Sequence, residues 1–200
     1  MKRIAVFSSG SGSNFEAIAK YFEEKANIKV ALLVCDQPQA YVIKRAERFG
    51  IPTHVVSPKD FSSKQAYEED VLNQCASYKV DFIVLAGYMR LIGSTLLRPY
   101  SGKIMNIHPS LLPAFPGKDA IGQALADRVK VSGVTIHFVD EGMDTGPIIA
   151  QQAVNVEPED NHESLGAKIQ QVEHALYPKI VEQCVQQEVF LEGGQVQWQR

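Results

Sequence analysis

Residues 4–14 read IAVFSSGSGSN, a short apolar run followed by small polar residues. The run has the length and composition of a buried β-strand, and a glycine-containing segment after a strand is typical of a tight turn into a helix. Comparable strands are predicted at residues 30–34, 53–56 and 82–85, and amphipathic helices at residues 14–25, 41–49 and 63–76. This alternation predicts an α/β fold with a largely parallel sheet, helices on both faces and right-handed crossovers.

The pattern changes in the C-terminal half of the chain. The elements predicted there are a strand, a short helix and two long strands, at residues 104–108, 120–127, 133–139 and 147–156. Only residues 140–146 separate the two long strands, and so short a connection makes them antiparallel neighbours. We therefore expect a three-layer, Rossmann-like fold whose mostly parallel sheet has an antiparallel part in the C-terminal half.

The last forty residues predict a long helix and a hairpin. The helix should run from about residue 161 to about residue 187, opened by Asp160 and Glu163 in a capping-box-like pattern. Pro178 should kink it. Residues 189–198, with two glycines in the middle, are typical of a small hairpin. Because no repeat, low-complexity tract or linker interrupts the sequence, residues 1–200 are expected to form one domain.

Composition excludes several classes of function. The 200 residues carry a net charge of −3 with no run of Lys and Arg, which argues against nucleic-acid and membrane partners. The three cysteines are far apart and form no Cys-x-x-Cys pair, and no His-Glu-x-x-His motif occurs. Neither a disulfide framework nor a metal site is expected. Without a signal peptide or a stretch that could span a bilayer, a cytoplasmic location is expected.

Residues 9–14, SGSGSN, follow the first strand and open the first helix. Free N–H groups at a helix N-terminus attract an anion, and small residues let a ligand approach the backbone, so a phosphate is the expected guest. Phe15 stands where the dinucleotide fingerprint has a glycine, and the Gly-Lys-Ser/Thr ending of a phosphate-loop NTPase is absent. The alternative is a tight turn with Ser13 or Asn14 as the N-cap.

Residues 106–113, NIHPSLLP, bring an amide and an imidazole to one face of a strand. Asn106 could donate a hydrogen bond to an oxyanion, and His108 could carry positive charge and shuttle protons. Asp144, on the turn-rich loop 140–147, could orient the imidazole and favour its charged form. These are the groups that acyl transfer without a covalent enzyme intermediate requires. The alternatives are a packed histidine and an ordinary turn aspartate.

Other residues give weaker signals. Residues 86–91, AGYMRL, could form the wall of a flat apolar pocket or part of the core. Glu173 would, on spacing alone, be a solvated surface acid. His137 is expected to pack or to cap rather than to react. The remaining histidines are expected to be structural or solvent-facing: His54, His162 and His174.

Taken together and in this order, the motifs resemble those of the folate-dependent phosphoribosylglycinamide formyltransferases over essentially the whole chain. The shared segments are SGSGSN, LAGYMR, NIHPSLLP, FPG, DEGMDTGP, QVEH and YP, at residues 9–14, 85–90, 106–113, 115–117, 140–147, 171–174 and 177–178. The resemblance implies the formyltransferase fold, with a phosphate-binding N-terminal half and a folate-binding, catalytic C-terminal half. It implies transfer of a formyl group from the co-substrate 10-formyltetrahydrofolate to the amine of glycinamide ribonucleotide in purine biosynthesis.

The resemblance also implies a role for individual residues. The implied catalytic residues are Asn106, His108 and Asp144. The implied phosphate-binding residues are Gly12, Ser13 and Asn14, and the implied ribose-binding residues are Gln170, Gln171 and Glu173. The implied folate-binding residues are Lys64, Met89, Arg90, Leu91, Ile92, Asn106, Asp140, Glu141, Gly142, Met143 and Asp144. Lys64 is a departure, because relatives often carry Arg there near the folate's glutamate tail, and lysine lacks the bidentate geometry. No metal is implied, and a monomer or weak homodimer is expected.

Three other functions stay open. A methionyl-tRNA formyltransferase shares the run at residues 106–113, but it should carry an Arg-Gly segment where this chain has FPG, and a C-terminal nucleic-acid-binding domain beyond Arg200. A formyltetrahydrofolate deformylase should carry an N-terminal regulatory domain, for which a first strand at Ile4 leaves no room. An inactive nucleotide-binding module is disfavoured by the intact catalytic trio.

Overall fold

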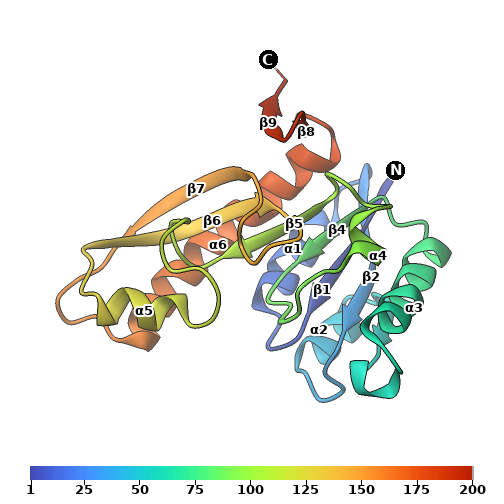
Figure 1. The fold of residues 1–200 in the computed structure, drawn as a ribbon, viewed down its shortest axis with the longest axis horizontal. Helices are drawn as coiled ribbons and strands as arrows, with labels where there is room; N and C mark the ends of the chain where they lie inside the picture. Colours follow the sequence, from blue (N-terminus) through green and yellow to red (C-terminus); the bar gives the residue numbers. More distant parts are fainter. Residues whose placement is uncertain (200) are drawn as a thin grey trace.

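A seven-stranded sheet forms the centre of the computed structural model, which describes residues 1–199 (Figure 1). The strand order is β3-β2-β1-β4-β5-β6-β7. Strands β1 to β5 pair in parallel, whereas β6 pairs antiparallel with both β5 and β7. The strands are β1 (Lys2–Ser8), β2 (Ile28–Cys35), β3 (Thr53–Val55), β4 (Phe82–Leu85), β5 (Ile104–His108), β6 (Val131–Phe138) and β7 (Ile148–Asn155). The predicted mixed α/β sheet is confirmed.

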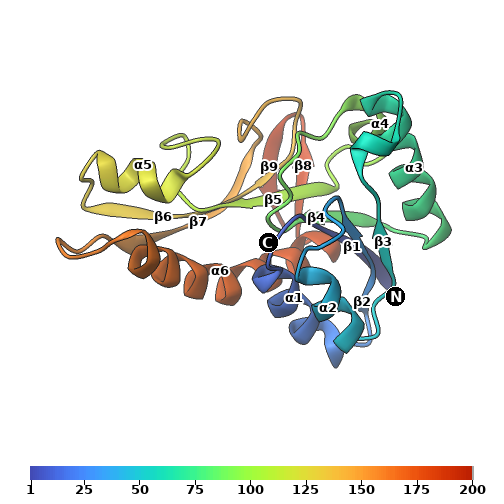
Figure 2. The ribbon, with the colours of Figure 1, turned by 90° about the horizontal axis from the view of Figure 1, so that it is seen from below.

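Helices cover the parallel part of the sheet on both faces, as Figure 2 shows. The helices are α1 (Ser13–Glu23), α2 (Val42–Arg48), α3 (Lys64–Ser77), α4 (Ser94–Leu97), α5 (Ala120–Ala126) and α6 (His162–Val185), with a 3₁₀ turn η1 (Pro58–Asp60). Of these, α5 lies beside the antiparallel strands β6 and β7. Successive side chains of β1 point to opposite faces of the sheet. Val6 packs in a core with α1, α2 and α6, whereas Phe7 packs in a second core with α3. None of the helices in the described residues combines the length and hydropathy needed to cross a membrane.

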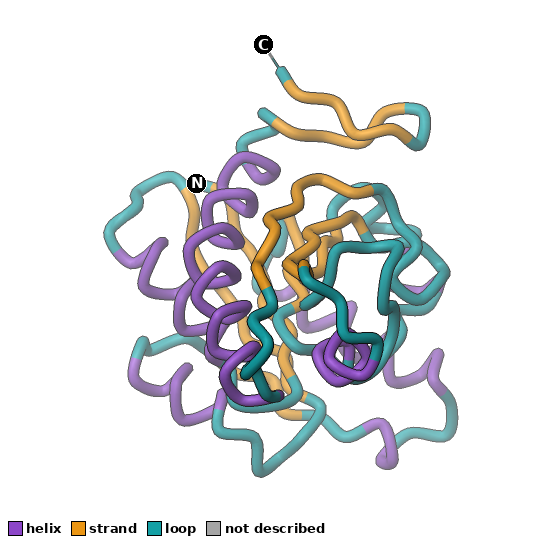
Figure 3. The backbone as a smooth tube through the Cα atoms, turned by 90° about the vertical axis from the view of Figure 1, so that its left-hand side faces the viewer, coloured by secondary structure: helices purple, strands orange, loops and turns teal. Residues whose placement is uncertain are grey.

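The long helix α6 is tied to the middle of the sheet by Tyr177. This side chain is fully buried, and its hydroxyl donates to the carbonyl oxygens of Leu85 (2.8 Å) and Met105 (3.3 Å). The two carbonyls belong to β4 and β5, so one hydroxyl fixes the helix against both strands. Figure 3 shows α6 running along the sheet, with the hairpin of β8 (Val189–Glu192) and β9 (Gln195–Trp198) beyond its end. The predicted hairpin is confirmed.

The cap of α6 differs from the prediction. Asn161 is the N-cap: its side chain accepts from the backbone N–H groups of Glu163 and Ser164, and the Ser164 hydroxyl completes the capping box. Asp160 and Glu163 therefore do not form the box, because the Asp160 carboxylate instead accepts from Lys168 and the Ser164 hydroxyl. The helix assignment is unbroken through Pro178, and the kink there stays a prediction.

Removing the Tyr177 hydroxyl should destabilise the fold without disturbing its shape. We expect Tyr177→Phe to lower the free energy of unfolding by about 1–2 kcal/mol, because buried carbonyl oxygens lose their donor. Urea unfolding followed by circular dichroism measures the change. Tyr41→Phe, at a half-exposed ring, is the matched control and should cost less than about 0.5 kcal/mol. Equal effects of the two substitutions would contradict the assignment of Tyr177 as a tie between α6 and the sheet.

Candidate active site

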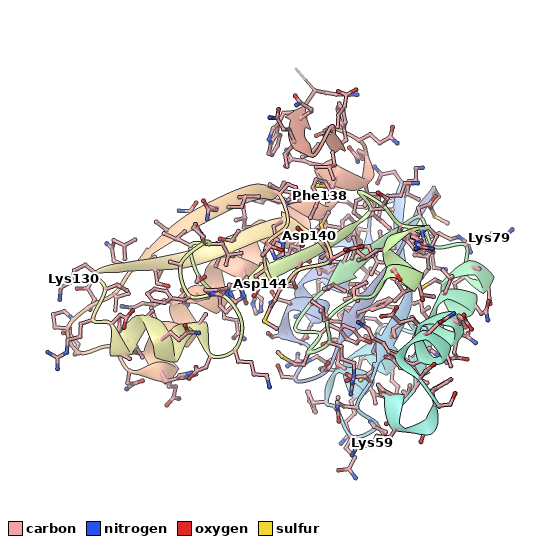
Figure 4. The ribbon with its side chains drawn as sticks, in the orientation of Figure 1. Lys59, Lys79, Lys130, Phe138, Asp140 and Asp144 are labelled. Atoms are coloured by element: carbon pink, nitrogen blue, oxygen red, sulfur yellow. The ribbon has the colours of Figure 1, made fainter. Side chains whose placement is uncertain are left out.

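A cavity of about 480 Å³ opens at the carboxyl ends of the parallel strands. Its walls come from Asn14, the last residue of the glycine loop (residues 9–14), the segment after β4, the end of β5, the loop before α5, the loop after β6, and two residues of α6, His162 and Glu173. Figure 4 labels Phe138 at the end of β6, and Asp140 and Asp144 on the loop that follows. Parallel α/β sheets bind ligands at this edge, and the sequence places the predicted chemistry there.

The predicted catalytic residues meet in this cavity. Strand β5 presents Asn106 and His108 on one face, and the loop after β6 brings Asp144 to them. The Asp144 Oδ2 atom lies 3.4 Å from His108 Nδ1, and the Asp144 Oδ1 atom lies 3.5 Å from Asn106 Nδ2. An amide donor, an imidazole and a carboxylate therefore form one contiguous group.

Both ring nitrogens of His108 face acceptors. The Nε2 atom lies 2.8 Å from the carbonyl oxygen of Phe115, and Nδ1 faces the Asp144 carboxylate. A carbonyl and a carboxylate can only accept, so each N–H of a charged imidazolium would find a partner. The side chain is also nearly inaccessible to solvent, with 5% of the residue exposed. These contacts and the burial therefore hold the ring of His108 in one orientation.

Asp144 is held in place by the backbone of the loop before α5. Its Oδ2 atom accepts from the N–H of Gly117 at 2.8 Å, and its own backbone adopts a left-handed conformation with φ of 56°. Burial alone would raise the pKa of this carboxyl, but hydrogen bonding with His137 and Gly117 and the charge of His108 hold the pKa below its ordinary value. Asp144 is therefore ionised at neutral pH.

His137 belongs to the same cluster, which sequence reasoning missed. It pairs directly with Asn106 in the β5–β6 register, and the two side chains approach to 3.3 Å between Asn106 Nδ2 and His137 Nε2. The other ring nitrogen, Nδ1, lies 2.8 Å from the Phe138 carbonyl and must donate to it. The Nε2 atom also lies 3.7 Å from Asp144 Oδ1, so His137 contacts both the amide and the carboxylate of the predicted catalytic residues. The residue is packed, as expected, but it also supports a catalytic candidate.

The glycine loop leads into α1 through Gly12. Gly12 is the N-cap of α1 with φ of 75°, and a side chain there would collide with Val42 of α2. No side chain caps the helix, so the alternative that made Ser13 or Asn14 the N-cap is wrong. Both side chains bond to α6 instead: Gln170 Nε2 donates to Ser13 Oγ, and Asn14 Nδ2 donates to Glu173 Oε2, each at 2.9 Å.

Glu173 is buried rather than solvated, which overturns the interpretation from spacing alone. Only 9% of the residue is exposed, and it lines the cavity beside Asn14. Burial raises the pKa of its carboxyl, and the hydrogen bond from Asn14 opposes this in part. The sequence could not show this burial, because it arises from the packing of α6 on α1. Gln171, by contrast, points to solvent and does not line the cavity.

The predicted folate residues divide between two cavities. Those lining the 480 Å³ cavity are Met89, Arg90, Leu91, Ile92, Asn106, Gly142, Met143 and Asp144. Lys64 lines a neighbouring cavity of about 390 Å³, where its Nζ atom lies 3.7 Å from Glu68 Oε1. Asp140 braces the loop after β6 by accepting from the Gly142 N–H and the Thr145 hydroxyl, and Glu141 is exposed. Within residues 1–199 no His, Cys, Asp and Glu side chains gather as a metal-ligand set.

The sequence matches the family described as "Formyl transferase" over residues 2–181. The chain belongs to the formyl transferase family. It is 55% identical to a phosphoribosylglycinamide formyltransferase of Bacillus subtilis (strain 168), over 92% of this chain and 95% of that protein. It is 41% identical to the trifunctional purine biosynthetic protein adenosine-3 of Drosophila melanogaster, over 92% of this chain and 14% of that protein.

Solved structures of other formyl transferases share the fold. The glycinamide ribonucleotide transformylase 1 of Symbiobacterium toebii superposes with a TM-score of 0.96 at 40% identity, covering 100% of this chain and 95% of that one. The phosphoribosylglycinamide formyltransferase of Bacillus halodurans has a TM-score of 0.88 at 56% identity, covering 91% and 94%. The formyltransferase fold expected from the sequence resemblance is therefore confirmed.

The buried carboxyl of Glu173 gives this formyl transferase a pH-dependent stability. A raised pKa in the folded state means that ionisation costs stability above the ordinary pKa of 4.5, and that the cost disappears at lower pH, where the group is protonated in both states. We expect Glu173→Gln to raise the melting temperature by a few degrees at pH 7.5 and to give no gain at pH 4. Glu188→Gln, at an exposed residue, should change neither value. A gain of the same size at both pH values would contradict the raised pKa.

Proposed function

We propose that this chain transfers the formyl group of 10-formyltetrahydrofolate to the primary amine of 5′-phosphoribosylglycinamide, a step of purine biosynthesis. The observation that supports this most is the meeting of Asn106, His108 and Asp144 in one cavity. The Asp144 carboxylate lies 3.4 Å from the His108 ring and 3.5 Å from the Asn106 amide. The relative from B. subtilis that is named for this reaction is 55% identical.

The phosphate of the ribonucleotide fits the glycine loop. Gly12, Ser13 and Asn14 open α1, whose first backbone N–H groups have no acceptor within the helix and form the positive end of its dipole. Glu173 and Gln170 of α6 hydrogen-bond to the side chains of Asn14 and Ser13, which supports a role for them beside the phosphate. We assign the ribose to these two residues, and to Gln171 only as a neighbour from solvent.

The folate fits the opposite part of the cavity. Met89 and Leu91 present 74% and 46% of their surface, which gives the wall an apolar face on which a flat ring can lie. The loop of Asp140, Glu141, Gly142 and Met143 faces this wall and would close over the pterin. Lys64, in the adjoining cavity, would meet the charged glutamate tail.

The transfer needs no covalent bond to the protein. The amine attacks the formyl carbon, the carbonyl oxygen becomes an oxyanion, and the tetrahedral centre then collapses with cleavage of its bond to the folate N10. On substrate binding, Asn106 would turn the N–H that faces Asp144 to the oxyanion, and charged His108 would turn the N–H that faces the Phe115 carbonyl to it. Asp144 would keep the imidazole charged and oriented. The proton lost by the amine reaches N10 through water, or His108 gives its own proton to N10 and then takes up the proton of the amine.

The state of the cysteines bears on the compartment in which the chain works. The three cysteines are free and buried, which fits a reducing compartment such as the cytoplasm. The partners proposed are the two small substrates, with a chain that acts as a monomer or weak homodimer.

Formyl transfer with purified components tests the proposal. The absorbance of the deformylated folate is followed with 10-formyltetrahydrofolate present, with and without 5′-phosphoribosylglycinamide. We expect turnover that depends on the amine. Folate consumption without the amine would indicate a hydrolase, and no consumption in either case would overturn the assignment of an active formyl transferase.

Loss of the catalytic groups should reduce turnover while both substrates still bind. We expect His108→Ala and Asp144→Asn each to lower kcat by about 100- to 1000-fold, because the first removes a donor to the oxyanion and the second removes the carboxylate that orients and charges that donor. His54→Asn, on β3 and outside the cavity lining, is the control and should retain the wild-type rate. Circular dichroism verifies that the variants fold. A folded His108→Ala variant with the wild-type kcat would refute the role of the imidazole.

A further inference from the structure

The wall of the proposed folate pocket is a segment without regular structure. Residues 86–93 join β4 to α4 in neither helix nor strand, and the 390 and 480 Å³ cavities lie against the same residues of this segment. Tyr88 and Ile92 are buried in the core, whereas Met89 and Leu91 are exposed. A segment that lacks a hydrogen-bonded ladder depends on side chains from elsewhere to hold its backbone.

The first half of this wall is fixed by the glycine loop. The Ser9 N–H donates to the Gly87 carbonyl at 3.0 Å, and the Ser9 hydroxyl accepts from the Met89 N–H at 2.9 Å. These contacts reach only to residue 89. The second half, residues 90–93, is held from two other directions.

Glu68 holds the end of the wall from α3. The residue is 3% exposed, and its Oε1 atom accepts from the Gly93 N–H at 2.7 Å. Gly93 is also the N-cap of α4, and a side chain at this position would collide with the Glu68 carboxylate. Lys64, one turn earlier on α3, lies 3.7 Å away and balances the charge of Glu68.

Asp36 holds the middle of the wall from the end of β2. The residue is 2% exposed, and its Oδ2 atom accepts from Arg90 Nε at 2.6 Å and from Gln37 Nε2 at 3.3 Å. Its Oδ1 atom is buried and has no hydrogen-bond partner among the described residues. A buried carboxylate with so few partners depends strongly on the cation beside it, so the ion pair fixes Arg90 as much as Arg90 stabilises Asp36.

We propose that Glu68 and Asp36 are positioning residues for folate binding: two buried carboxylates, from α3 and from the end of β2, hold the Gly93 amide and the Arg90 side chain and so set the shape of the wall at residues 88–93. Neither carboxylate needs to touch folate. The inference rests on the proposed function, since it names what shapes the folate half of that site. The inference distinguishes the two substrates, because Glu68 and Asp36 hold residues 90–93, which are not part of the proposed ribonucleotide site.

The test measures binding of each substrate separately. Isothermal titration of the full chain with tetrahydrofolate, and then with 5′-phosphoribosylglycinamide, gives both dissociation constants for the wild type and four variants. The variants are Glu68→Met, Glu68→Gln, Asp36→Asn and the control Glu69→Gln. Glu69 is the exposed neighbour of Glu68 on α3 and bonds only within the helix, to Gln65. Melting temperatures report on folding.

Substitutions of Glu68 and of Asp36 should weaken tetrahydrofolate binding to different degrees. Glu68→Met removes the acceptor for the Gly93 N–H, and we expect the Kd for tetrahydrofolate to rise about tenfold or more. Glu68→Gln keeps an accepting oxygen and should bind within about threefold of the wild type. Asp36→Asn leaves Arg90 with a neutral partner, and we expect a rise of about fivefold or more. The Kd for the ribonucleotide should stay within about twofold in all variants, and Glu69→Gln should match the wild type.

Each other outcome overturns the inference. Unchanged tetrahydrofolate affinity in folded Glu68→Met and in Asp36→Asn would show that the wall keeps its shape without the two carboxylates. An equal loss for both substrates would indicate general destabilisation. If Glu68→Met does not fold, the isosteric variants Asp36→Asn and Glu68→Gln test the inference. Wild-type tetrahydrofolate affinity in Asp36→Asn would contradict the role of Asp36, and a tenfold loss of affinity in Glu68→Gln would contradict the role of Glu68. A wild-type chain that binds the ribonucleotide but no tetrahydrofolate would refute the proposed function instead.

Discussion

The carboxylate of Asp144 is the contact on which the active-site cavity depends. It joins three segments that are distant in sequence: it accepts from the Gly117 amide, it lies 3.4 Å from His108 on β5, and it lies 3.7 Å from His137 on β6. The loop that carries it connects two antiparallel strands, so its position is set by the sheet on both sides. Because these contacts keep Asp144 ionised despite burial, the cavity holds a fixed negative charge beside the imidazole.

The change from parallel to antiparallel pairing explains why the chemistry lies where it does. Strand β5 is the last parallel strand and the first partner of β6, so Asn106 faces both the ligand edge of the parallel sheet and His137 across the antiparallel ladder. Helix α6 joins the two halves a second time. Its Tyr177 hydroxyl donates to the last residue of β4 and the second residue of β5, and one turn earlier Glu173 contacts Asn14 at the start of α1. The substrates of the proposed reaction would therefore meet at a junction that the core itself holds rigid.

The sequence predicts the longer elements, and the shared face of Asn106 and His108, because those signals are local. Apolar runs of strand length mark β1, β2, β4 and β5, and the spacing of Asn106 and His108 places them on one face. The short helix α4 and the turn η1 were missed, since four or fewer residues give no periodic pattern. His137 and the burial of Glu173 depend on strand register and on helix packing, which no local pattern contains. The organisation into one domain and the individual binding roles stay predictions.

One structure determination tests the central claim most directly: a crystal of the chain soaked with 5′-phosphoribosylglycinamide and tetrahydrofolate together. The account predicts the phosphate on the backbone N–H groups of residues 12–14, the pterin against residues 89–92, and the glycinamide nitrogen within hydrogen-bonding reach, about 3 Å, of Asn106 or His108. A complex with the phosphate elsewhere, or with the amine turned away from both side chains, would contradict it.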